Sequence, residues 1–378
     1  MKILISSYYY LPYTSGVTIY IKNLAEWLVK KGHQVTIFCS QHDKTLPEKE
    51  IINGVEVIRE KILCSFGKGV IMPKFFLKVA VRAKKFDIVN LHFPNADLGI
   101  SSLFIPKEKL VITYHCDLFL GKSFINQLIQ KISFLFMYLW VKRCKWIIGN
   151  SLEYFKHSYF HRFRKKFREI YPPINFEDFE GIQEDFWFIK KKDYFYLGFL
   201  WRIVYEKGIN FLLESLQDPR LKEKKIHLLL WGDFSSVRWG SVLGELEGLI
   251  QKNKERITIL GKIPSCQLTS FYNTLDLLVL PSIDPLESFW MVQVESLYNN
   301  TPVVASDMPW VNEVIKKTKF WYLAIKKDSQ SIATQILKIM DEKEKYQVLK
   351  RWNVLRKKIK KIFSYEKVIE FYEKCFTD

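Results

Sequence analysis

The chain lacks the marks of a disulfide-linked, zinc-bound or membrane-spanning protein. Its six cysteines are scattered without close pairs, which argues against a disulfide framework or a zinc site and favours a reducing compartment. Residues 2–6 have the pattern of a buried strand, so we expect no signal peptide. The longest largely apolar run, Ile132–Val141, is shorter than the roughly 20 residues that a helix needs to span a bilayer. Together these features predict a cytoplasmic protein.

Acidic residues are scarce in the first half of the chain. Residues 1–172 contain 27 Lys and Arg against 12 Asp and Glu, whereas the remaining 206 residues contain 31 against 28. Such a basic excess suits nucleic acid, an anionic membrane surface or an anionic acceptor, and it also suits a plain solubilising surface. Because the sequence contains no recognised nucleic-acid-binding module, we expect no nucleic-acid partner.

Apolar strands alternate with helices along the whole chain. In the first part, strands are predicted at Lys2–Ser7, Gln34–Cys39, Val55–Arg59, Asp87–His92, Leu110–Tyr114 and Trp146–Asn150. The break Tyr171–Phe176, with two prolines, then marks a linker. Four further strands are predicted at Asp193–Leu200, His227–Phe234, Ile257–Ile263 and Leu275–Ser282. This alternation predicts parallel, doubly wound sheets, and 378 residues suit two domains.

Two carboxylates, Glu287 and Glu295, follow the strand Leu275–Ser282, and Glu295 lies inside the next helix. In a doubly wound sheet, strand ends and helix N-termini meet at one crevice. A helix N-terminus there favours an anion. The two acids themselves suit hydroxyl groups, such as those of a sugar or a ribose. The plain alternative is that both are solvated helix charges.

Two cations, Arg202 and Lys207, lie across a predicted strand-to-helix turn. Both can reach one diphosphate from there, the arginine as a planar fork and the lysine as a point charge. The alternative is a pair of surface cations.

The first domain has candidates at the ends of its own strands. Gly16 lies in the loop after the first strand and precedes a helix predicted from about Ile19, so it faces substrate or simply forms a turn. His115 and Asp117 follow the strand Leu110–Tyr114; Asp117 could orient His115, bind acceptor or be an ordinary loop acid. His92 also ends a strand, and we interpret it as structural. The glycine loop is not a G-x-G-x-x-G fingerprint, so a dinucleotide oxidoreductase is only weakly supported.

Three segments resemble signature motifs of the retaining GT-B glycosyltransferases of family 4. They are Glu287 to Glu295 as Glu-x7-Glu, RIVYEKG from Arg202 to Gly208, and the N-terminal LPYTSGVTIYIKNLAEWLVKKGHQVTIF. The resemblance covers nearly the whole chain and implies an α/β GT-B fold, two Rossmann-like doubly wound domains facing a cleft. Residues 1–175 would form the acceptor-side domain, with the C-terminal helix 364–378 packing back on it. Residues 176–363 would bind the nucleotide sugar.

This resemblance implies an activity and a set of site residues. The activity is retaining, metal-independent transfer of a hexosyl group from a UDP- or GDP-sugar to a glycan or lipid-linked acceptor in cell-surface polysaccharide or glycolipid synthesis. Catalytic roles fall to His115, Glu287, Arg202 and Lys207, and donor-binding roles to Gly16, Arg202, Lys207, Glu287, Phe289, Trp290, Met291 and Glu295. His115 would position the sugar, Glu287 would bind its hydroxyls and Glu295 the ribose. No Asp-x-Asp motif occurs, so we expect no metal and no cofactor besides the donor.

Tryptophan replaces glycine at several places in this pattern. Trp201, Trp290, Trp310 and Trp321 stand where the family commonly has glycine, and a backbone that cradles phosphate needs glycine for close approach. The donor pocket is therefore rebuilt, or it is blocked in a non-catalytic glycan-assembly subunit, or the tryptophans are UGA codons that the cell reads as glycine. A nucleotide-sugar epimerase of the same architecture is a further alternative.

Two segments of the basic domain combine aromatic and basic residues. Residues 122–143 are predicted to form a long helix with an apolar centre and basic ends, and HRFRKKFR follows at residues 161–168. Core packing and a solvated helix face are the plain interpretations. The combination also suits a lipid headgroup layer, so we expect that the protein can attach peripherally to the inner face of the cell membrane.

Overall fold

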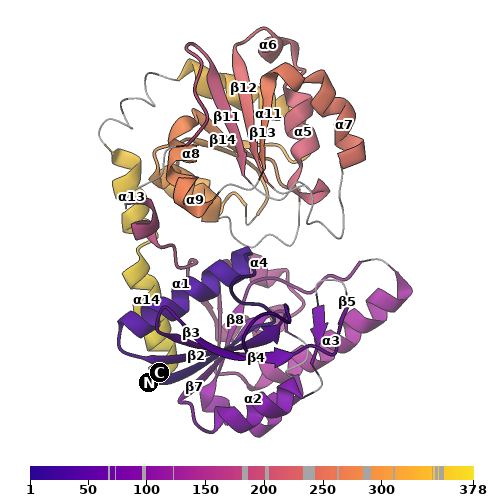
Figure 1. The fold of residues 1–378 in the computed structure, drawn as a ribbon, viewed down its shortest axis with the longest axis vertical. Coiled ribbons are helices and arrows are strands. Elements are labelled where there is room, and N and C mark those ends of the chain that lie inside the picture. Colours follow the sequence, from indigo (N-terminus) through magenta and orange to yellow (C-terminus); the bar gives the residue numbers. More distant parts are fainter. Residues whose placement is uncertain are drawn as a thin grey trace. The chain divides into compact units, whose positions relative to one another are not determined.

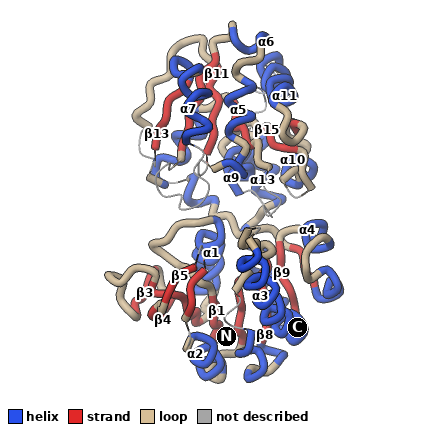
Figure 2. Tube along the Cα trace, turned by 90° about the vertical axis from the view of Figure 1, so that its right-hand side faces the viewer, coloured by secondary structure: helices blue, strands red, loops and turns tan. Residues whose placement is uncertain are grey.

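The computed structural model describes the chain apart from residues 67–68, 73, 96–98, 122, 181–185, 201–203, 233–242, 262–263, 284–290, 310, 343, 345–347 and 349–352. The chain forms two compact units. Unit 1 comprises Met1–Ile174 and Tyr365–Asp378, and unit 2 comprises Asn175–Ser364. Each unit is an α/β layer structure, and Figure 2 shows its strands with helices on both sides.

Unit 1 is built on an eight-stranded sheet with the order β10-β9-β8-β7-β1-β2-β4-β3. All its neighbouring strands are parallel except the pair β3 and β4. The strands are β1 (Lys2–Ser6), β2 (Gln34–Gln41), β3 (Lys49–Ile52), β4 (Val55–Lys61), β7 (Ile88–Phe93), β8 (Leu110–Tyr114), β9 (Trp146–Gly149) and β10 (Phe167–Glu169). A separate ribbon pairs β5 (Cys64–Phe66) with β6 (Gly69–Ile71).

Helices cover both faces of this sheet. The helices are α1 (Gly16–Lys30), α2 (Phe75–Ala83), α3 (Phe124–Arg143), α4 (Leu152–Lys156) and α14 (Tyr365–Thr377), and the 3-10 turns are η1 (Gly99–Phe104), η2 (Lys107–Lys109) and η3 (His161–Lys166). Apolar side chains of α1 and α14 share one core with alternate residues of β1, β2 and β4. Figure 1 shows the helix α14 beside α1. On the other face, Phe75 of α2 stacks on Phe38. Because successive side chains of a strand point to opposite faces of the sheet, the sheet has two cores, one beneath each layer of helices.

Helix α1 begins three residues earlier than predicted, at Gly16 instead of Ile19. Ser15 caps it: the Thr18 amide donates to Ser15 Oγ, and the Ser15 amide donates to Thr18 Oγ1. This reciprocal pair is a capping box, with threonine in place of the usual acid.

The hairpin of β3 and β4 was not predicted. Its turn is Asn53-Gly54, and both residues have positive φ, 49° and 81°. Such a turn matches the right-handed twist of the two strands.

Helix α3 is 20 residues long, and in the part of the chain that is described it alone could cross a membrane by length and composition. The apolar run Ile132–Val141 is therefore part of a longer helix, and the length of that run does not describe the helix as a whole. The cluster at residues 161–168 also differs from a simple helix face, since it forms the turn η3 and the strand β10.

Unit 2 contains a parallel six-stranded sheet with the order β13-β12-β11-β14-β15-β16. The strands are β11 (Phe195–Leu200), β12 (Ile226–Trp231), β13 (Ile257–Gly261), β14 (Leu277–Leu280), β15 (Val303–Ser306) and β16 (Tyr322–Ala324). Its helices are α5 (Ile209–Ser215), α6 (Pro219–Lys222), α7 (Leu243–Lys252), α8 (Leu268–Thr274), α9 (Met291–Tyr298), α10 (Glu313–Thr318), α11 (Ser329–Asp341) and α13 (Val354–Ile362), with the turns η4 (Phe176–Phe179) and η5 (Tyr205–Lys207). Apolar residues of α5, α6, α7 and α11 pack on β11, β12 and β14.

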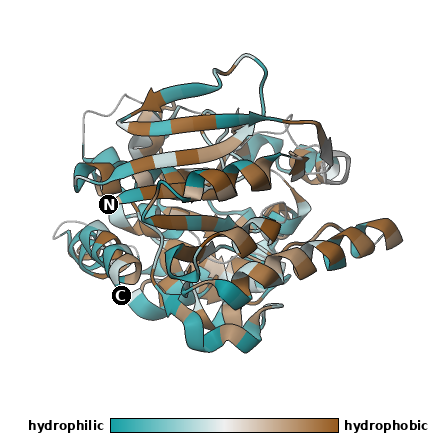
Figure 3. Cartoon of the chain, turned by 90° about the horizontal axis from the view of Figure 1, so that it is seen from below, coloured by the Kyte–Doolittle hydropathy of each residue, from teal (hydrophilic) through white to brown (hydrophobic). Residues whose placement is uncertain are grey.

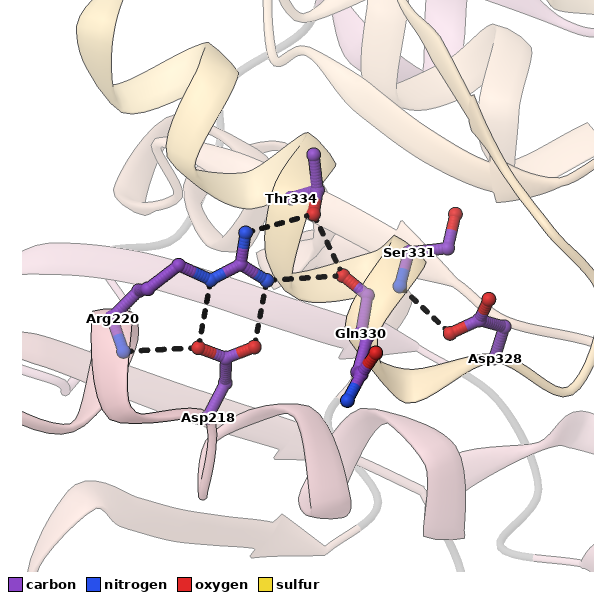
Figure 4. A network of polar contacts seen from close by, with 6 residues as sticks. All are labelled: Asp218, Arg220, Asp328, Gln330, Ser331 and Thr334. Carbon is purple, nitrogen blue, oxygen red and sulfur yellow. Dashed lines mark hydrogen bonds and ion pairs between the residues drawn. The ribbon is translucent and has the colours of Figure 1, made fainter.

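Arg220 links two helices of this layer. Its guanidinium donates to both carboxylate oxygens of Asp218, at 2.9 and 2.7 Å, and to Thr334 Oγ1 at 3.2 Å (Figure 4). Asp218 caps α6, while Thr334 lies on α11. The contacts fix α6 against α11, and we assign this cluster a packing role.

The prediction of two Rossmann-like, doubly wound α/β sheets is confirmed. In each sheet the strand order reverses at one strand, from which the chain continues first to one side and later to the other. This strand is β1, between β2 and β7, in unit 1, and β11, between β12 and β14, in unit 2. Ligands of doubly wound sheets bind at the carboxyl ends of the strands at such a switch point.

Candidate functional site

In unit 1, three features noted in the sequence lie at or just after the ends of three neighbouring strands. The loop with Gly16 follows β1, His92 lies near the end of the adjacent strand β7, and His115 follows the next strand, β8. Register pairing places His92 opposite Thr113, two residues before His115. Parallel strands therefore bring both histidines to one edge of the sheet.

The two histidines contact each other directly. His92 Nδ1 lies 2.9 Å from His115 Nε2, and both side chains are buried, with exposed fractions of 2% and 5%. Burial lowers the pKa of His115 to about 3. Burial, together with His115, also holds the pKa of His92 well below its usual value. Both rings are therefore neutral at physiological pH, and one donates a hydrogen bond to the other.

The hydrogen-bond pattern favours one tautomer. His92 Nε2 is buried without a hydrogen-bond partner. An orphaned lone pair occurs more readily in a protein interior than an orphaned N–H, so we assign the proton of His92 to Nδ1. His92 then donates to His115 Nε2, and His115 carries its proton on Nδ1. A neutral imidazole of this kind is a hydrogen-bond donor without charge.

A tyrosine network supports the histidine pair. The ring of Tyr20, on α1, lies edge-on to His115 at 4.9 Å between centroids. Its hydroxyl lies 2.7 Å from that of Tyr372 on α14, which in turn lies 3.0 Å from Thr113 Oγ1. Asn90 Nδ2 donates to the same threonine oxygen at 3.1 Å. The C-terminal helix thus holds the strands and helix that position His115, a role that sequence analysis missed.

Asp117 does not orient His115. Its carboxylate accepts hydrogen bonds from Tyr114 Oη at 2.5 Å and from the Tyr159 amide at 2.9 Å. Burial raises its pKa. Of the three alternatives for Asp117, the structure therefore does not support the orienting role, because its carboxylate binds groups beside it and His92 takes the orienting position.

Gly16 is the first residue of α1, and a Cβ at this position would meet no atom within 4 Å. Packing within the protein therefore does not require glycine here.

In unit 2, Lys207 lies at the β11–β14 switch point. It ends the turn η5 and has an exposed fraction of 1%. Gly208 follows with φ 67°, and a Cβ there would lie 2.0 Å from the Pro281 carbonyl oxygen, so glycine is required. The Glu206 carbonyl accepts from the Ile283 amide at 2.9 Å and from Ser282 Oγ at 3.0 Å. The lysine turn is thereby fixed against the segment that leads to residues 284–290.

Glu295 lies on α9, partly buried, and Tyr272 Oη donates to its Oε2 at 2.8 Å. Burial raises the pKa of this carboxyl to about 7, opposed by the Tyr272 bond and reinforced by Asp178. Hydrogen bonds donated to the ionised form of this carboxyl would lower its pKa again.

The remaining predicted site residues and the other three tryptophans differ in what the structure describes of them. Met291 begins α9 and is partly exposed. Arg202, Glu287, Phe289 and Trp290, and likewise Trp201 and Trp310, lie outside the described residues. Trp321 packs against the unit 2 core.

Within the described ranges, no three His, Cys, Asp or Glu side chains come together in a way that would hold a metal ion. The unit 1 switch point instead offers a neutral imidazole pair, which can donate a hydrogen bond to a hydroxyl-bearing group. Unit 2, taken by itself, offers a buried lysine and a carboxyl with a raised pKa, which suit an anion and hydroxyl groups.

Comparisons with known families cover both halves of the chain. The family "Glycosyltransferase Family 4" matches residues 14–178, and "Glycosyl transferases group 1" matches residues 182–353.

Relatives with similar sequences carry related names. An uncharacterised glycosyltransferase of Methanocaldococcus jannaschii is 26% identical over 90% of each chain. The alpha-monoglucosyldiacylglycerol synthase of Streptococcus pneumoniae is 23% identical over 82% of this chain and 72% of that protein. The phosphatidyl-myo-inositol mannosyltransferase of Mycobacterium leprae is 23% identical over 92% of each.

Solved structures share the fold. A sucrose-phosphate synthase from Thermosynechococcus elongatus superposes with a TM-score of 0.73 at 20% identity over 99% of each chain. Anabaena HepE in complex with UDP-glucose superposes with a TM-score of 0.72 at 18% identity, over 99% of this chain and 98% of that one.

Proposed function

Since this chain belongs to the GT-B glycosyltransferases of family 4, we propose that it transfers a hexosyl group from a UDP- or GDP-linked sugar, with retention of configuration. The acceptor is a glycan or a lipid-linked molecule of the cell surface, and the enzyme works at the cytoplasmic face of the membrane. Names of two relatives, a glucosyldiacylglycerol synthase and a phosphatidylinositol mannosyltransferase, support the glycolipid class of acceptor. The neighbour in complex with UDP-glucose supports a nucleotide-sugar donor.

The observation that carries this proposal is the buried Lys207 on a turn that Gly208 locks against Pro281. A cation fixed in this way at a strand's carboxyl end can meet the diphosphate of the donor without reorganising. As the bond from the sugar C1 to the diphosphate oxygen breaks, negative charge grows on the leaving group, and Lys207 stabilises it. Arg202, five residues earlier, would share this role.

The other residues bind and orient. Glu295 accepts hydrogen bonds from the ribose in its ionised form, and Glu287 from the transferred sugar. His115, neutral and fixed by His92, donates from Nδ1 to a sugar oxygen. The acceptor hydroxyl forms the new bond to C1, and its proton leaves with the diphosphate. The donor is the only small molecule that this scheme requires, and no metal enters it.

A panel of UDP- and GDP-sugars in a thermal-shift experiment tests the proposal. A ligand at 100 times its Kd stabilises the folded protein by about 2.7 kcal/mol, which a melting curve resolves. We expect one nucleotide sugar to stabilise the protein and then to be consumed with an acceptor extract, giving a product of unchanged anomeric configuration by NMR. If no nucleotide or nucleotide sugar stabilises the protein, it is a non-catalytic subunit with a blocked pocket.

A further inference from the structure

The outer side of α3 carries a continuous row of large apolar side chains. Exposed fractions are 82% for Phe124, 66% for Ile125, 50% for Leu128, 47% for Ile132, 64% for Leu135 and 39% for Tyr138. These positions recur at helical spacing, so they lie along one face. Figure 3 shows α3 as a mostly brown helix that projects from the rest of unit 1. Only five residues of the helix are buried, Ser133, Phe134, Met137, Trp140 and Val141, and an apolar patch of this extent marks an interaction surface.

The other side of α3 is firmly attached to unit 1. Trp140 is fully buried, and a Cβ at Gly99 of η1 would lie 2.5 Å from the Phe136 carbonyl oxygen. Arg143 donates to the Ser102 and Ile105 carbonyls. Lys166 Nζ binds the carbonyls of Val141, Lys142 and Cys144 at the C-terminal end. The helix cannot cross a bilayer without losing these contacts, so its outer face can only lie along a surface.

The charges around this face have one sign. Helix α3 contains no Asp or Glu, and residues 118–168 contain eleven Lys and Arg against one acid, Glu153, which pairs with Lys156. The cations Arg162, Arg164 and Lys165 of η3 are exposed. η3 lies beside α3, since the Phe163 ring meets the Tyr138 ring at 5.4 Å. An apolar row with a basic border is complementary to acyl chains beneath anionic headgroups.

We propose that unit 1 docks on an anionic lipid bilayer by inserting the outer face of α3, with Arg162, Arg164 and Lys165 on the headgroups. The most exposed apolar residues, Phe124 and Ile125, begin the helix, and the loop before them starts at His115. Docking through this end brings the carboxyl edge of the unit 1 sheet to the bilayer surface. That orientation, though not the docking itself, rests on the proposed function, because a lipid-linked acceptor would then emerge near His115.

The structure separates this proposal from attachment by charge alone. Of the five basic residues at 161–168, Lys166 binds three carbonyls, and the Arg168 guanidinium stacks on Trp146 at 3.7 Å. Replacing those two would damage unit 1 itself. Leu128 and Leu135, with exposed fractions of 50% and 64%, and the three exposed cations are therefore the sites to change.

Flotation of the full chain with vesicles tests the docking. The vesicles are phosphatidylcholine alone and phosphatidylcholine with phosphatidylglycerol. We expect Leu128→Ser/Leu135→Ser to lower binding to anionic vesicles at least about tenfold, because two inserted leucines are lost. The matched control, Ile51→Ser/Leu63→Ser, removes two aliphatic side chains with exposed fractions of 74% and 72% outside α3, and it should bind like the unaltered protein.

The charge component is measured with Arg162→Ser/Arg164→Ser/Lys165→Ser. Each removed charge should lower binding to anionic vesicles about fivefold, and the binding that remains should be less sensitive to salt. Hydrogen exchange should show vesicle-dependent protection within residues 124–138. Both variant sets are compared with the unaltered protein by circular dichroism and by binding of the nucleotide sugar found in the thermal-shift panel, which neither should change.

Three outcomes overturn the docking: no binding of the unaltered protein to anionic vesicles, equal binding of Leu128→Ser/Leu135→Ser, or a dimer in sedimentation that this variant dissociates. The last result would assign the face to a second copy of the chain. Vesicle binding without nucleotide-sugar binding would instead remove the proposed function and leave the docking intact.

Discussion

His92 Nδ1 and His115 Nε2 lie 2.9 Å apart, and both imidazoles are buried and neutral. This pair joins the ends of two adjacent parallel strands. It fixes the ring plane and the tautomer of His115 without charging it. In the proposed function, this neutral imidazole donates from Nδ1 to a sugar oxygen without adding a charge.

His92 is expected to act through His115, as a positioning residue. In His92→Asn, the side-chain amide places a polar group where Nδ1 of His92 lies and can keep the hydrogen bond to His115. In His92→Phe, that polar group and the hydrogen bond are lost. The lost hydrogen bond corresponds to about 1–1.5 kcal/mol, so the Phe variant should lose about tenfold in kcat and the Asn variant clearly less. Affinity for the free nucleotide, measured by calorimetry, should stay unchanged in both. Equal losses in the two variants would show that His92 only fills space.

The same pair should make folding sensitive to acid. In the unfolded chain a histidine binds its proton below about pH 6.5, whereas folded His115 does so only near pH 3 and the pKa of His92 is also lowered. Between these values the unfolded state holds more protons. The contribution of these histidines to the free energy of unfolding should therefore fall as pH falls below 6.5, by up to about 1.4 kcal/mol per pH unit for each histidine, and be flat above it.

Urea unfolding of the unaltered protein and of His115→Gln from pH 4 to pH 8 measures this slope. The Gln variant keeps a group at the ε position toward His92 and removes one titrating ring. Its slope below pH 6.5 should be shallower. An identical slope in both proteins would assign the acid sensitivity to other groups.

Much of this architecture is readable from sequence, and the reasons are local. Strands such as Leu110–Tyr114 are short apolar runs buried on both faces, so their limits are visible in the residues. The Asn53-Gly54 pair is a sequence signal for the turn of the β3–β4 hairpin, which was not predicted. The Ser15–Thr18 capping box likewise indicates where α1 begins, three residues before the predicted start.

The support of His115 could not be predicted in this way. Thr113 and Tyr372 meet although 259 residues separate them, because the C-terminal helix packs back beside α1. The pairing of His92 with His115 depends on strand order and register, which one sequence does not specify. An orienting role was one of three alternatives for Asp117, which is near His115 in sequence, yet its carboxylate binds Tyr114 and Tyr159.

Lys207 should matter for turnover more than for folding. Lys207→Met keeps the aliphatic stem in the buried turn and removes the charge that meets the diphosphate. Removing one preorganised group that stabilises a developing charge typically costs about 10²–10³ in kcat. The matched control is Lys224→Met, an exposed lysine of unit 2. A loss of activity that only follows the loss of folded protein would refute the diphosphate role.

Glu295 should link donor binding to pH. Its pKa in the free protein is about 7, and the ribose hydroxyls need the ionised carboxylate as acceptor. Binding then releases a proton, so donor affinity should fall by up to about tenfold per pH unit below pH 7 and stay constant above it. Glu295→Gln should bind donor 1–3 kcal/mol more weakly at pH 8, an order-of-magnitude estimate for a bond to a charged acceptor. Its affinity should not vary with pH across this range.

Stability provides an independent measurement for the same residue. The carboxyl's folded pKa of about 7 lies above its ordinary value of 4.5, so the folded state is favoured while the group is protonated. That contribution is lost as pH rises from 4.5 through 7. Glu295→Gln should therefore be more stable than the unaltered protein at pH 8, by on the order of 1–2 kcal/mol, while binding donor less well. A variant that loses both stability and affinity would make Glu295 a structural residue.

The tryptophans give the last prediction. Trp201 precedes Arg202 and Trp290 precedes Met291, at places where the family commonly has glycine, so an indole at either place would occupy space near the donor. If the native code reads UGA as glycine, the gene has UGA at codons 201, 290, 310 and 321, and the native protein is lighter than this sequence by four Trp-to-Gly differences in intact-mass spectra. UGG at all four codons would end that hypothesis. The variant Trp201→Gly/Trp290→Gly then distinguishes a blocked pocket from a rebuilt one. If the tryptophans block the pocket, the variant should gain nucleotide-sugar binding, and if they rebuild it, the variant should lose that binding. The control Trp187→Gly, at an exposed position, should leave nucleotide-sugar binding unchanged.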